Sequence, residues 1–212
     1  STGTGKTTQM RALIAQMRVR RDRAVVFDLT GAYVEAFYNP QTDVILNPMD
    51  ERCPSWSVFG EAKNHADFTG IAAALLPADG GGAEPFWMLA ARTLFVETCI
   101  KLIKDGQATN QALASRLMMA DLKEVHKMLE NTVADPLTAP EAAKMAESIR
   151  AVFNTNAQAL RFLPEGKEPF SIQTWIRNDD KPGSILFITS SHNELVLNRA
   201  LLSLWMNLAV HT

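Results

Sequence analysis

The chain opens on a glycine-rich run that reads as a phosphate-binding loop. Residues 1–8 are Ser-Thr-Gly-Thr-Gly-Lys-Thr-Thr, and one glycine ahead of them would complete the pattern G-x-x-x-x-G-K-[ST]. The glycines of such a loop let consecutive backbone N–H groups converge on a phosphate, and the following helix adds the positive end of its dipole. We therefore expect a nucleotide-binding site formed by Ser1, Thr2, Gly3, Thr4, Gly5, Lys6, Thr7 and Thr8.

The last residues of the motif carry its chemistry. Lys6 is expected to reach the β- and γ-phosphates of ATP, and the Thr7 hydroxyl is expected to bind Mg²⁺. A bare Gly-Lys-Thr run can also be a glycine-rich turn that caps a helix. The order of elements favours the phosphate loop, because residues 9–21 show the apolar period of a helix and residues 23–28 read as a buried strand.

Asp28 ends that strand and admits two interpretations. At the carboxyl end of a strand in a parallel sheet it lies where ligands gather, which makes it a candidate catalytic residue beside Lys6. It can equally close the strand through an Asx turn with its own backbone, since Leu-Thr-Gly follows. The sequence leaves both interpretations open.

The chain divides into three parts by the type of its periodicity. Residues 1–56 and 164–212 alternate helices and strands, with further strands expected at 44–46 and 184–190 and a closing helix at 195–210. Residues 57–163 are expected to be all helical and to fold separately from the nucleotide core. The predicted fold class is α/β, with a P-loop core interrupted by an all-α domain. Its helices are predicted at 68–76, 86–104, 110–119, 122–131 and 139–162, the last with a break, and a short helix is expected at 170–176.

The second half of a hydrolytic site is missing from the pattern. A P-loop motor needs an apolar strand that ends in Asp-Glu, to hold Mg²⁺ and polarise water. Asp28 is followed by Leu29, and the strand at 184–190 ends in Thr-Ser. We expect the chain to be a piece of a larger ATPase that binds nucleotide without turnover.

Composition restricts how the chain can contact DNA. The 21 basic and 23 acidic residues give a net charge of −2, which excludes a domain that grips nucleic acid by bulk positive charge. The arginines of residues 11–23 can form a solvated helix face or a local nucleic-acid patch. The dispersed tryptophans can be core residues or stack on bases. Cysteines and histidines show no metal-site spacing.

Seven segments together resemble the conjugative type IV coupling proteins (the TraD/TrwB family). The ILNPxDxR run with Trp56 close behind it, and the FW…AR element of residues 86–92, are narrower signals than the phosphate loop. The segments read STGTGKTTQMRALI, RAVVFDLTGAYVEAFYNP, DVILNPMDERCPSWSVF, EPFWMLAARTLF, ESIRAVF, EPFSIQTWI and SILFITSS.

This resemblance implies a RecA-like motor of the FtsK/HerA lineage. Such a protein is a homo-hexamer at the cytoplasmic face of the inner membrane, and it couples ATP hydrolysis to transfer of single-stranded DNA. The helical part would be the family's all-alpha domain, which is linked to relaxosome proteins, and the other partners would be type IV secretion system components. By position, Gly3, Gly5, Lys6 and Thr7 match the Walker A motif, and Asp28 matches an acid after the second core strand.

Two other functions fit the same residues. The chain could be a recruitment module for relaxosome proteins without catalysis of its own, in which the P-loop half is a scaffold. It could also be a small-molecule P-loop kinase with a helical lid, in which Asp28 would serve as the acceptor base.

Overall fold

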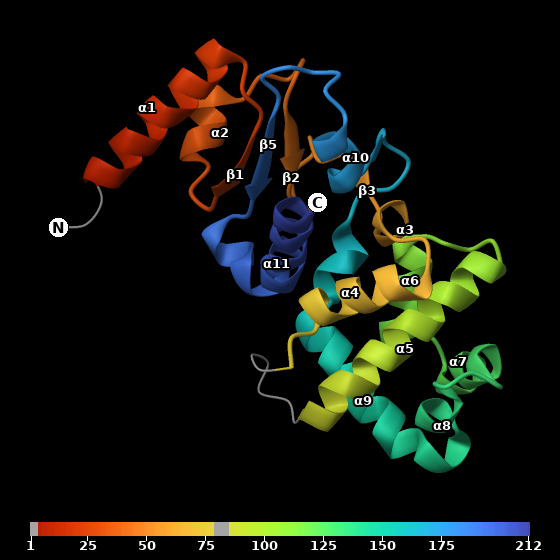
Figure 1. The fold of residues 1–212 in the computed structure, drawn as a ribbon. Coiled ribbons are helices and arrows are strands. Elements are labelled where there is room, and N and C mark those ends of the chain that lie inside the picture. The colour runs from red at the N-terminus through yellow and green to blue at the C-terminus, as the bar shows by residue number, and fades with distance from the viewer. Residues whose placement is uncertain (1–3, 79–84) are drawn as a thin grey trace.

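The computed structural model describes residues 4–78 and 85–212. A three-stranded parallel sheet lies at one end of the molecule, and a block of helices lies at the other (Figure 1). The strand order is β1-β5-β2, so the strand that is last in the sequence is central. Every residue of β5 is buried, as expected for an apolar strand covered on both faces. The strands are β1 (Ala24–Asp28), β2 (Val44–Leu46) and β5 (Ile185–Thr189).

Alternate residues of the strands supply two hydrophobic clusters, one on each face of the sheet. Val26, Ile45 and Phe187 pack with α1 (Thr4–Arg20) and α2 (Ala32–Phe37). The opposite face packs against α11 (Leu195–His211), which was predicted as the closing helix. Together with the helical insertion, this arrangement confirms the predicted α/β class.

Helix α1 begins earlier than the predicted residue 9. Its first residue is Thr4, so Gly5 to Thr8 lie in its first turns. The residue that follows the helix, Arg21, has a left-handed backbone conformation with φ of 60°. The N–H of Asp22 donates to the carbonyl of Met17, which closes the helix as in a Schellman motif. A Cβ on Gly183 would lie 3.3 Å from the Cα of Arg21, so this close approach requires glycine.

The helical block follows most of the predicted segments, with two corrections. The predicted helix at 139–162 is divided into a 3₁₀ turn, a helix and a second 3₁₀ turn. The pair Asp135-Pro136, expected to separate helices, starts a short helix, because proline is tolerated in a first turn. The elements are α3 (Val58–Glu61), α4 (His65–Leu75), α5 (Pro85–Lys104), α6 (Asn110–Met118), α7 (Leu122–Leu129), α8 (Asp135–Thr138), η1 (Pro140–Ala142), α9 (Ala143–Asn156) and η2 (Gln158–Phe162).

A small parallel ribbon joins the block to the sheet domain. β3 (Ser55–Trp56) pairs with β4 (Pro169–Phe170), although no strand was predicted at either place. Pairing of Phe170 also delays the helix predicted at 170–176, which forms as α10 (Ile172–Arg177). The chain therefore enters and leaves the helical block side by side. The short turn η3 (His192–Glu194) then precedes α11.

Buried polar groups hold this junction together. The Glu61 carboxylate accepts from Trp56 Nε1 at 2.8 Å, from the Ile172 N–H at 2.5 Å and from the Ser171 hydroxyl at 3.1 Å. Asn110 adds a second bridge, because its amide donates to the Trp56 carbonyl at 2.7 Å. These donors compensate for the burial of the Glu61 carboxylate.

The hydrophobic core does not stop at the boundary of the helical block. One cluster of buried side chains contains residues of the block together with Leu186 and Ile188 of β5 and Trp205 of α11. Trp56 and Trp205 meet edge to face, with ring centroids 5.6 Å apart. The expectation that residues 57–163 fold separately is therefore not supported by the packing, because α11 supplies part of their core.

We expect residues 57–163, expressed alone, to be helical but poorly packed. The apolar surface that α11 covers in the whole chain would be exposed. Far-UV circular dichroism should show helix, while strong binding of the dye ANS and a broad thermal transition should distinguish the piece from the 212-residue chain. A sharp transition without ANS binding would restore the predicted division at residues 57 and 163.

We expect Glu61→Ala to lower the free energy of unfolding by roughly 2–4 kcal/mol, because it leaves the buried N–H groups of Trp56 and Ile172 without an acceptor. Urea unfolding followed by tryptophan fluorescence measures the change. Glu147→Ala, at an exposed position of α9, is the matched control and should change stability by less than about 0.5 kcal/mol. Equal effects of the two variants would contradict the role of Glu61.

Candidate nucleotide-binding site

The start of α1 has the properties of a phosphate-binding helix end. Gly5 and Lys6 are exposed, and a Cβ at Gly5 would meet no atom within 4 Å, so the backbone there is open to a ligand. The first turn carries no acidic residue that would neutralise the helix dipole. Of the other predicted contacts, Ser1, Thr2 and Gly3 lie outside the described residues, while Thr4, Thr7 and Thr8 fall in the first two turns.

Contacts at the other end of α1 determine its direction. Arg18 donates to the carbonyl of Gly183 at 2.8 Å, just before β5 begins, so the C-terminus of α1 lies at the amino edge of the sheet. The helix runs roughly antiparallel to the strands, and its first turn lies on the side of their carboxyl ends while projecting away from the sheet (Figure 1). This is the edge at which ligands bind in open α/β sheets.

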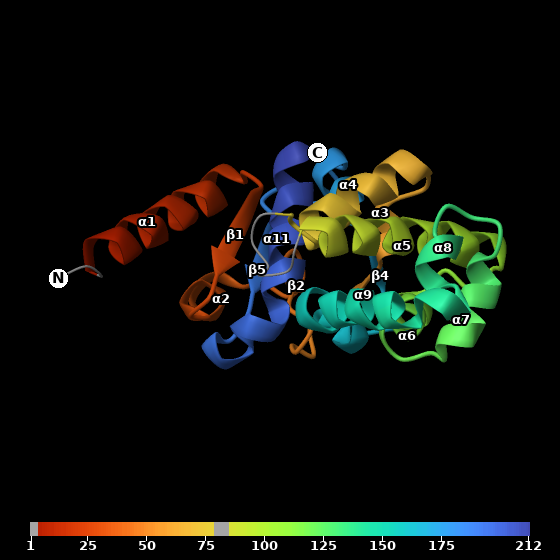
Figure 2. The ribbon, with the colours of Figure 1, turned by 90° about the horizontal axis from the view of Figure 1, so that it is seen from below.

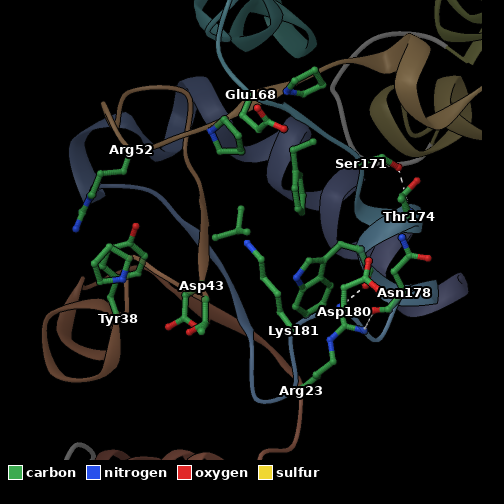
Figure 3. A pocket seen from close by; sticks show the side chains of 17 residues that line it. Arg23, Tyr38, Asp43, Arg52, Glu168, Ser171, Thr174, Asn178, Asp180 and Lys181 are labelled. Atoms are coloured by element: carbon green, nitrogen blue, oxygen red, sulfur yellow. Dashed lines mark hydrogen bonds between the residues drawn. The ribbon is translucent and has the colours of Figure 1, made fainter.

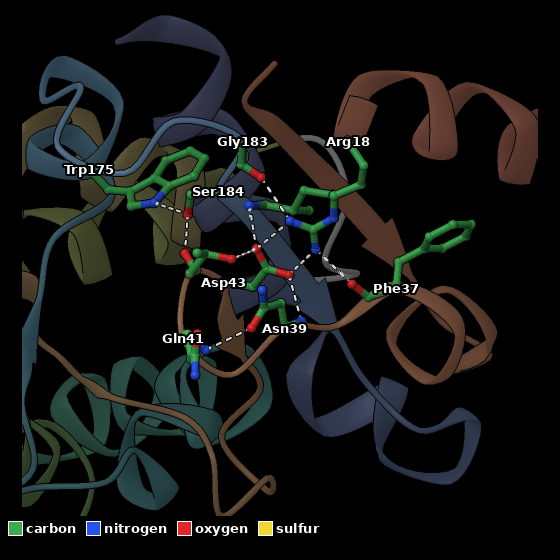
Figure 4. A network of polar contacts seen from close by, with 10 residues as sticks. Arg18, Phe37, Asn39, Gln41, Asp43, Trp175, Gly183 and Ser184 are labelled. Atoms are coloured by element: carbon green, nitrogen blue, oxygen red, sulfur yellow. Dashed lines mark hydrogen bonds and ion pairs between the residues drawn. The ribbon is translucent and has the colours of Figure 1, made fainter. Parts of the chain in front are cut away.

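Arg18 forms its main contact with Asp43, as Figure 4 shows. The Asp43 carboxylate is buried and accepts hydrogen bonds from both terminal nitrogens of Arg18. It also accepts from the N–H groups of Asn39 at 2.8 Å and Ile185 at 2.9 Å, and from the Thr42 hydroxyl at 3.1 Å. Arg18 therefore forms a structural ion pair with Asp43, and it belongs neither to a solvated helix face nor to a nucleic-acid patch.

Asp28 is a helix cap in this structure. It is 1% exposed, and its Oδ1 accepts from the N–H and hydroxyl of Thr30 at 3.2 and 3.1 Å. Its Oδ2 accepts from the N–H groups of Tyr33 at 2.9 Å and Val34 at 3.0 Å, at the start of α2. The geometry confirms the Asx turn, the second of the two interpretations. The catalytic role of Asp28 stays a prediction.

A polar cluster at the carboxyl end of β5 was not predicted from the sequence. Ser190 follows the strand, and its hydroxyl accepts from Asn198 Nδ2 at 3.1 Å. Asn198 is fully buried in α11, and its Oδ1 has no donor among the described residues. The available signal was Asn198 itself, a polar residue inside an otherwise apolar helix. A buried carbonyl without a partner at this edge can accept a hydrogen bond from a ligand or water.

A cavity at the opposite, amino edge of the sheet is lined by none of the predicted site residues. It measures about 490 Å³, and Figure 3 shows Lys181 extending into it. Arg23 stacks 4.1 Å from the Trp175 ring centre and donates to backbone carbonyls there. Arg52 donates to Asp50 at 2.7 Å, and this hydrogen bond lowers the pKa of the Asp50 carboxyl. The Arg23 guanidinium and the Trp175 ring therefore already contact each other and are not free to bind a ligand by stacking.

Two further findings concern the described residues as a whole. They contain no group of three or more His, Cys, Asp and Glu side chains placed to hold a metal ion. None of their helices combines the length and the apolar character needed to cross a membrane.

The whole chain, residues 1–212, matches the model of a protein family described as the type IV secretion-system coupling protein DNA-binding domain. The chain belongs to this family. It is 32% identical over 213 residues to the coupling protein TraD of Escherichia coli (strain K12), and the alignment covers 98% of this chain and 30% of TraD.

Solved structures of another coupling protein share the fold. The unbound form of the bacterial conjugative coupling protein TrwB matches with a TM-score of 0.84 and 32% identity. TrwB in complex with ADP and Mg²⁺ matches with a TM-score of 0.84 and 31% identity. Each alignment covers 99% of this chain and 49% of the TrwB chain, so the chain spans about half the length of these relatives.

We expect Arg18→Met to lower the free energy of unfolding by roughly 3 kcal/mol, because it leaves the buried Asp43 carboxylate without its cation. Arg11→Met, at an exposed position of the same helix, is the matched control and should cost less than about 0.5 kcal/mol. Urea unfolding of both variants provides the test. If Arg18→Met unfolds at the same urea concentration as Arg11→Met, the ion pair does not hold α1.

Proposed function

We propose that this chain is the ATP-binding part of a conjugative DNA-transfer motor, which links relaxosome and single-stranded DNA to a type IV secretion channel. The observation that carries the proposal is the match of all 212 residues to the coupling-protein family. The structure supports it with an exposed lysine in the first turn of a helix that begins on the side of the carboxyl ends of a parallel sheet.

We assign ATP and Mg²⁺ as ligands of this end of α1. The residues present fit them, because the first turn offers open backbone at Gly5, an exposed ammonium at Lys6 and no competing acid. Lys6 would bind the β- and γ-phosphates, and the Thr7 hydroxyl would hold Mg²⁺. The metal, when bound, supplies positive charge beside the transferring phosphoryl group. TrwB, a family relative, is described in complex with ADP and Mg²⁺.

Hydrolysis requires groups beyond those of this chain. Asp28 uses its carboxylate oxygens to cap α2, so it is poorly placed to activate water or a substrate hydroxyl. This argues against the kinase alternative. A motor of this kind would draw the missing acid and an arginine from the rest of the parent protein or from a neighbour in a homo-hexamer.

The partners and the place of action follow from the family rather than from a contact in the structure. We propose single-stranded DNA, relaxosome proteins and type IV secretion system components as partners, at the cytoplasmic face of the inner membrane. Residues 57–163 would serve partner choice, because the described part of this segment carries no phosphate-binding or metal-binding arrangement. A pure recruitment module remains the alternative if nucleotide does not bind.

In the complete parent protein, Lys6→Ala should reduce ATP hydrolysis at least about 100-fold, because it removes a charge that acts on the γ-phosphate. The fold should be unaffected, since the Lys6 side chain is exposed. Lys127→Ala, an exposed lysine of α7, is the control and should hydrolyse ATP normally. Unchanged ATP hydrolysis by the Lys6 variant would contradict the assignment of this end of α1 as the nucleotide-binding site.

The 212-residue chain alone should bind ADP without hydrolysing ATP. Fluorescence titration with a labelled ADP should show Mg²⁺-dependent binding that Lys6→Ala weakens, while phosphate release stays at background. Robust turnover by the purified chain would show that an acid within it completes the site. The variant Asp28→Asn would then test whether that acid is Asp28.

A further inference from the structure

A second cavity lies in the helical block, at the end remote from the sheet. It measures about 390 Å³ and is bounded by the end of α6, the start of α7, the loop before η1 and the first turns of α9. Figure 2 shows α7 and α8 at the opposite end of the molecule from α1 and β1. None of the residues discussed for nucleotide binding lines this cavity.

One cationic side chain in this cavity has no close anionic partner. Arg150 of α9 donates from Nη2 to the carbonyl of Ala120 at 2.6 Å. No carboxylate lies within 4.0 Å of its guanidinium among the described residues, and its Nε is buried without an acceptor. Burial lowers the pKa of Arg150, and the more distant charges of Asp121 and Glu147 oppose that effect. A half-buried guanidinium in this state gains from an anionic partner.

The neighbouring polar groups are already engaged. The Asp121 carboxylate accepts from the N–H of Lys123 at 2.8 Å and caps α7. His126 lies 3.4 Å from the Thr138 hydroxyl and 3.6 Å from the Asp135 carboxylate. Lys123 also lines the cavity, but it is exposed to water, so Arg150 is the cation that gains most from a partner outside the chain.

The walls of the cavity decide which anion fits. They include Met119, which is 55% exposed, and the aliphatic side chains of Leu122, Ala139, Pro140 and Ala143. Among the described residues no Phe, Tyr or Trp ring lines the cavity, and the one imidazole, His126, lies against Thr138 and Asp135. Residues 52–163 hold 12 acidic and 11 basic residues, too little positive charge to attract a phosphate backbone. A carboxylate flanked by aliphatic side chains matches this surface better than a nucleotide does.

We propose that this cavity binds an acidic peptide segment of a partner protein, with a carboxylate on Arg150 and adjacent aliphatic side chains against Met119, Leu122 and Ala143. Bidentate binding of a carboxylate by the guanidinium would satisfy the charge, and the aliphatic contacts would remove the exposed Met119 from water. The inference rests on the proposed function only for the identity of the partner, a protein recruited for transfer.

The test is a titration of the ¹⁵N-labelled 212-residue chain, followed by NMR. The probe is the peptide acetyl-Leu-Asp-Leu-amide, and its matched control is acetyl-Leu-Asn-Leu-amide, which has the same shape without the charge. We expect saturable shifts of the Ala120, Leu122 and Ala143 amides with the acidic peptide and at least tenfold weaker binding of the control. Arg150→Gln should also weaken binding at least tenfold, whereas Arg161→Gln, an exposed arginine outside the cavity, should not.

A second variant tests the proposal even if Arg150→Gln fails to fold. Ala143→Leu fills the cavity from an exposed position and keeps the guanidinium, so it should block the acidic peptide while the spectrum stays native. Equal binding of both peptides, or no saturable shift, overturns the proposal. Shifts at the same amides caused by a decathymidine strand, or by dilution of the chain alone, would assign the cavity to nucleic acid or to a second copy and overturn it as well.

ATP hydrolysis by the parent protein separates this inference from the proposed function. Peptide binding to the chain, combined with no ATP hydrolysis by the parent, would contradict the proposed function and leave the inference standing. Hydrolysis that Lys6→Ala abolishes, combined with no peptide binding, would overturn the inference alone. In the parent, Arg150→Gln should retain hydrolysis and lose transfer.

Discussion

The arrangement of the sheet and its first helix depends on one buried carboxylate. Asp43 accepts from Arg18 on α1, from the backbone of Ile185 at the start of β5 and from the turn that precedes β2. A buried charge is tolerated only when it is paired and hydrogen-bonded, and here the partners come from three segments of the chain. The segments that meet at the amino edge of the sheet are therefore held together by an ion pair and hydrogen bonds as well as by apolar packing.

A second buried carboxylate does the same for the connection between sheet and helices. Glu61 holds Trp56 of β3 and the first turn of α10 together, and both lie beside the Trp56–Trp205 contact. The two halves of the chain thus share one core and one polar bridge. A helical insertion that is held in this way can transmit a load to the sheet, which a loosely tethered domain cannot.

The sequence predicted well those features whose signals are local. Long apolar-periodic segments such as those of α5 and α6 mark helices without knowledge of the fold. The cap Asn64 was overlooked, so α4 begins at His65 and not at the predicted residue 68. β3 and β4 escaped prediction because two residues have no period. The roles of Asp43 and Glu61 could not be read either, because Ile185 and Ile172 are 142 and 111 residues away from them. Of the candidate site, only the proposed phosphate-binding end of α1 and the cap at Asp28 could be read from the sequence.

Helix α1 is fixed near its C-terminus, since Ile14 is buried and Arg18 is paired while the side chains of residues 5–13 are exposed. The helix is therefore held at the amino edge of the sheet. Lys6 lies 12 residues from Arg18, about 18 Å along the axis, so a tilt of the helix by about 5° about Arg18 moves the lysine by roughly 1.6 Å. Displacements of about 1 Å are enough to change catalytic rates about 100-fold. The position of the proposed phosphate-binding end therefore depends on an ion pair at the opposite edge of the sheet.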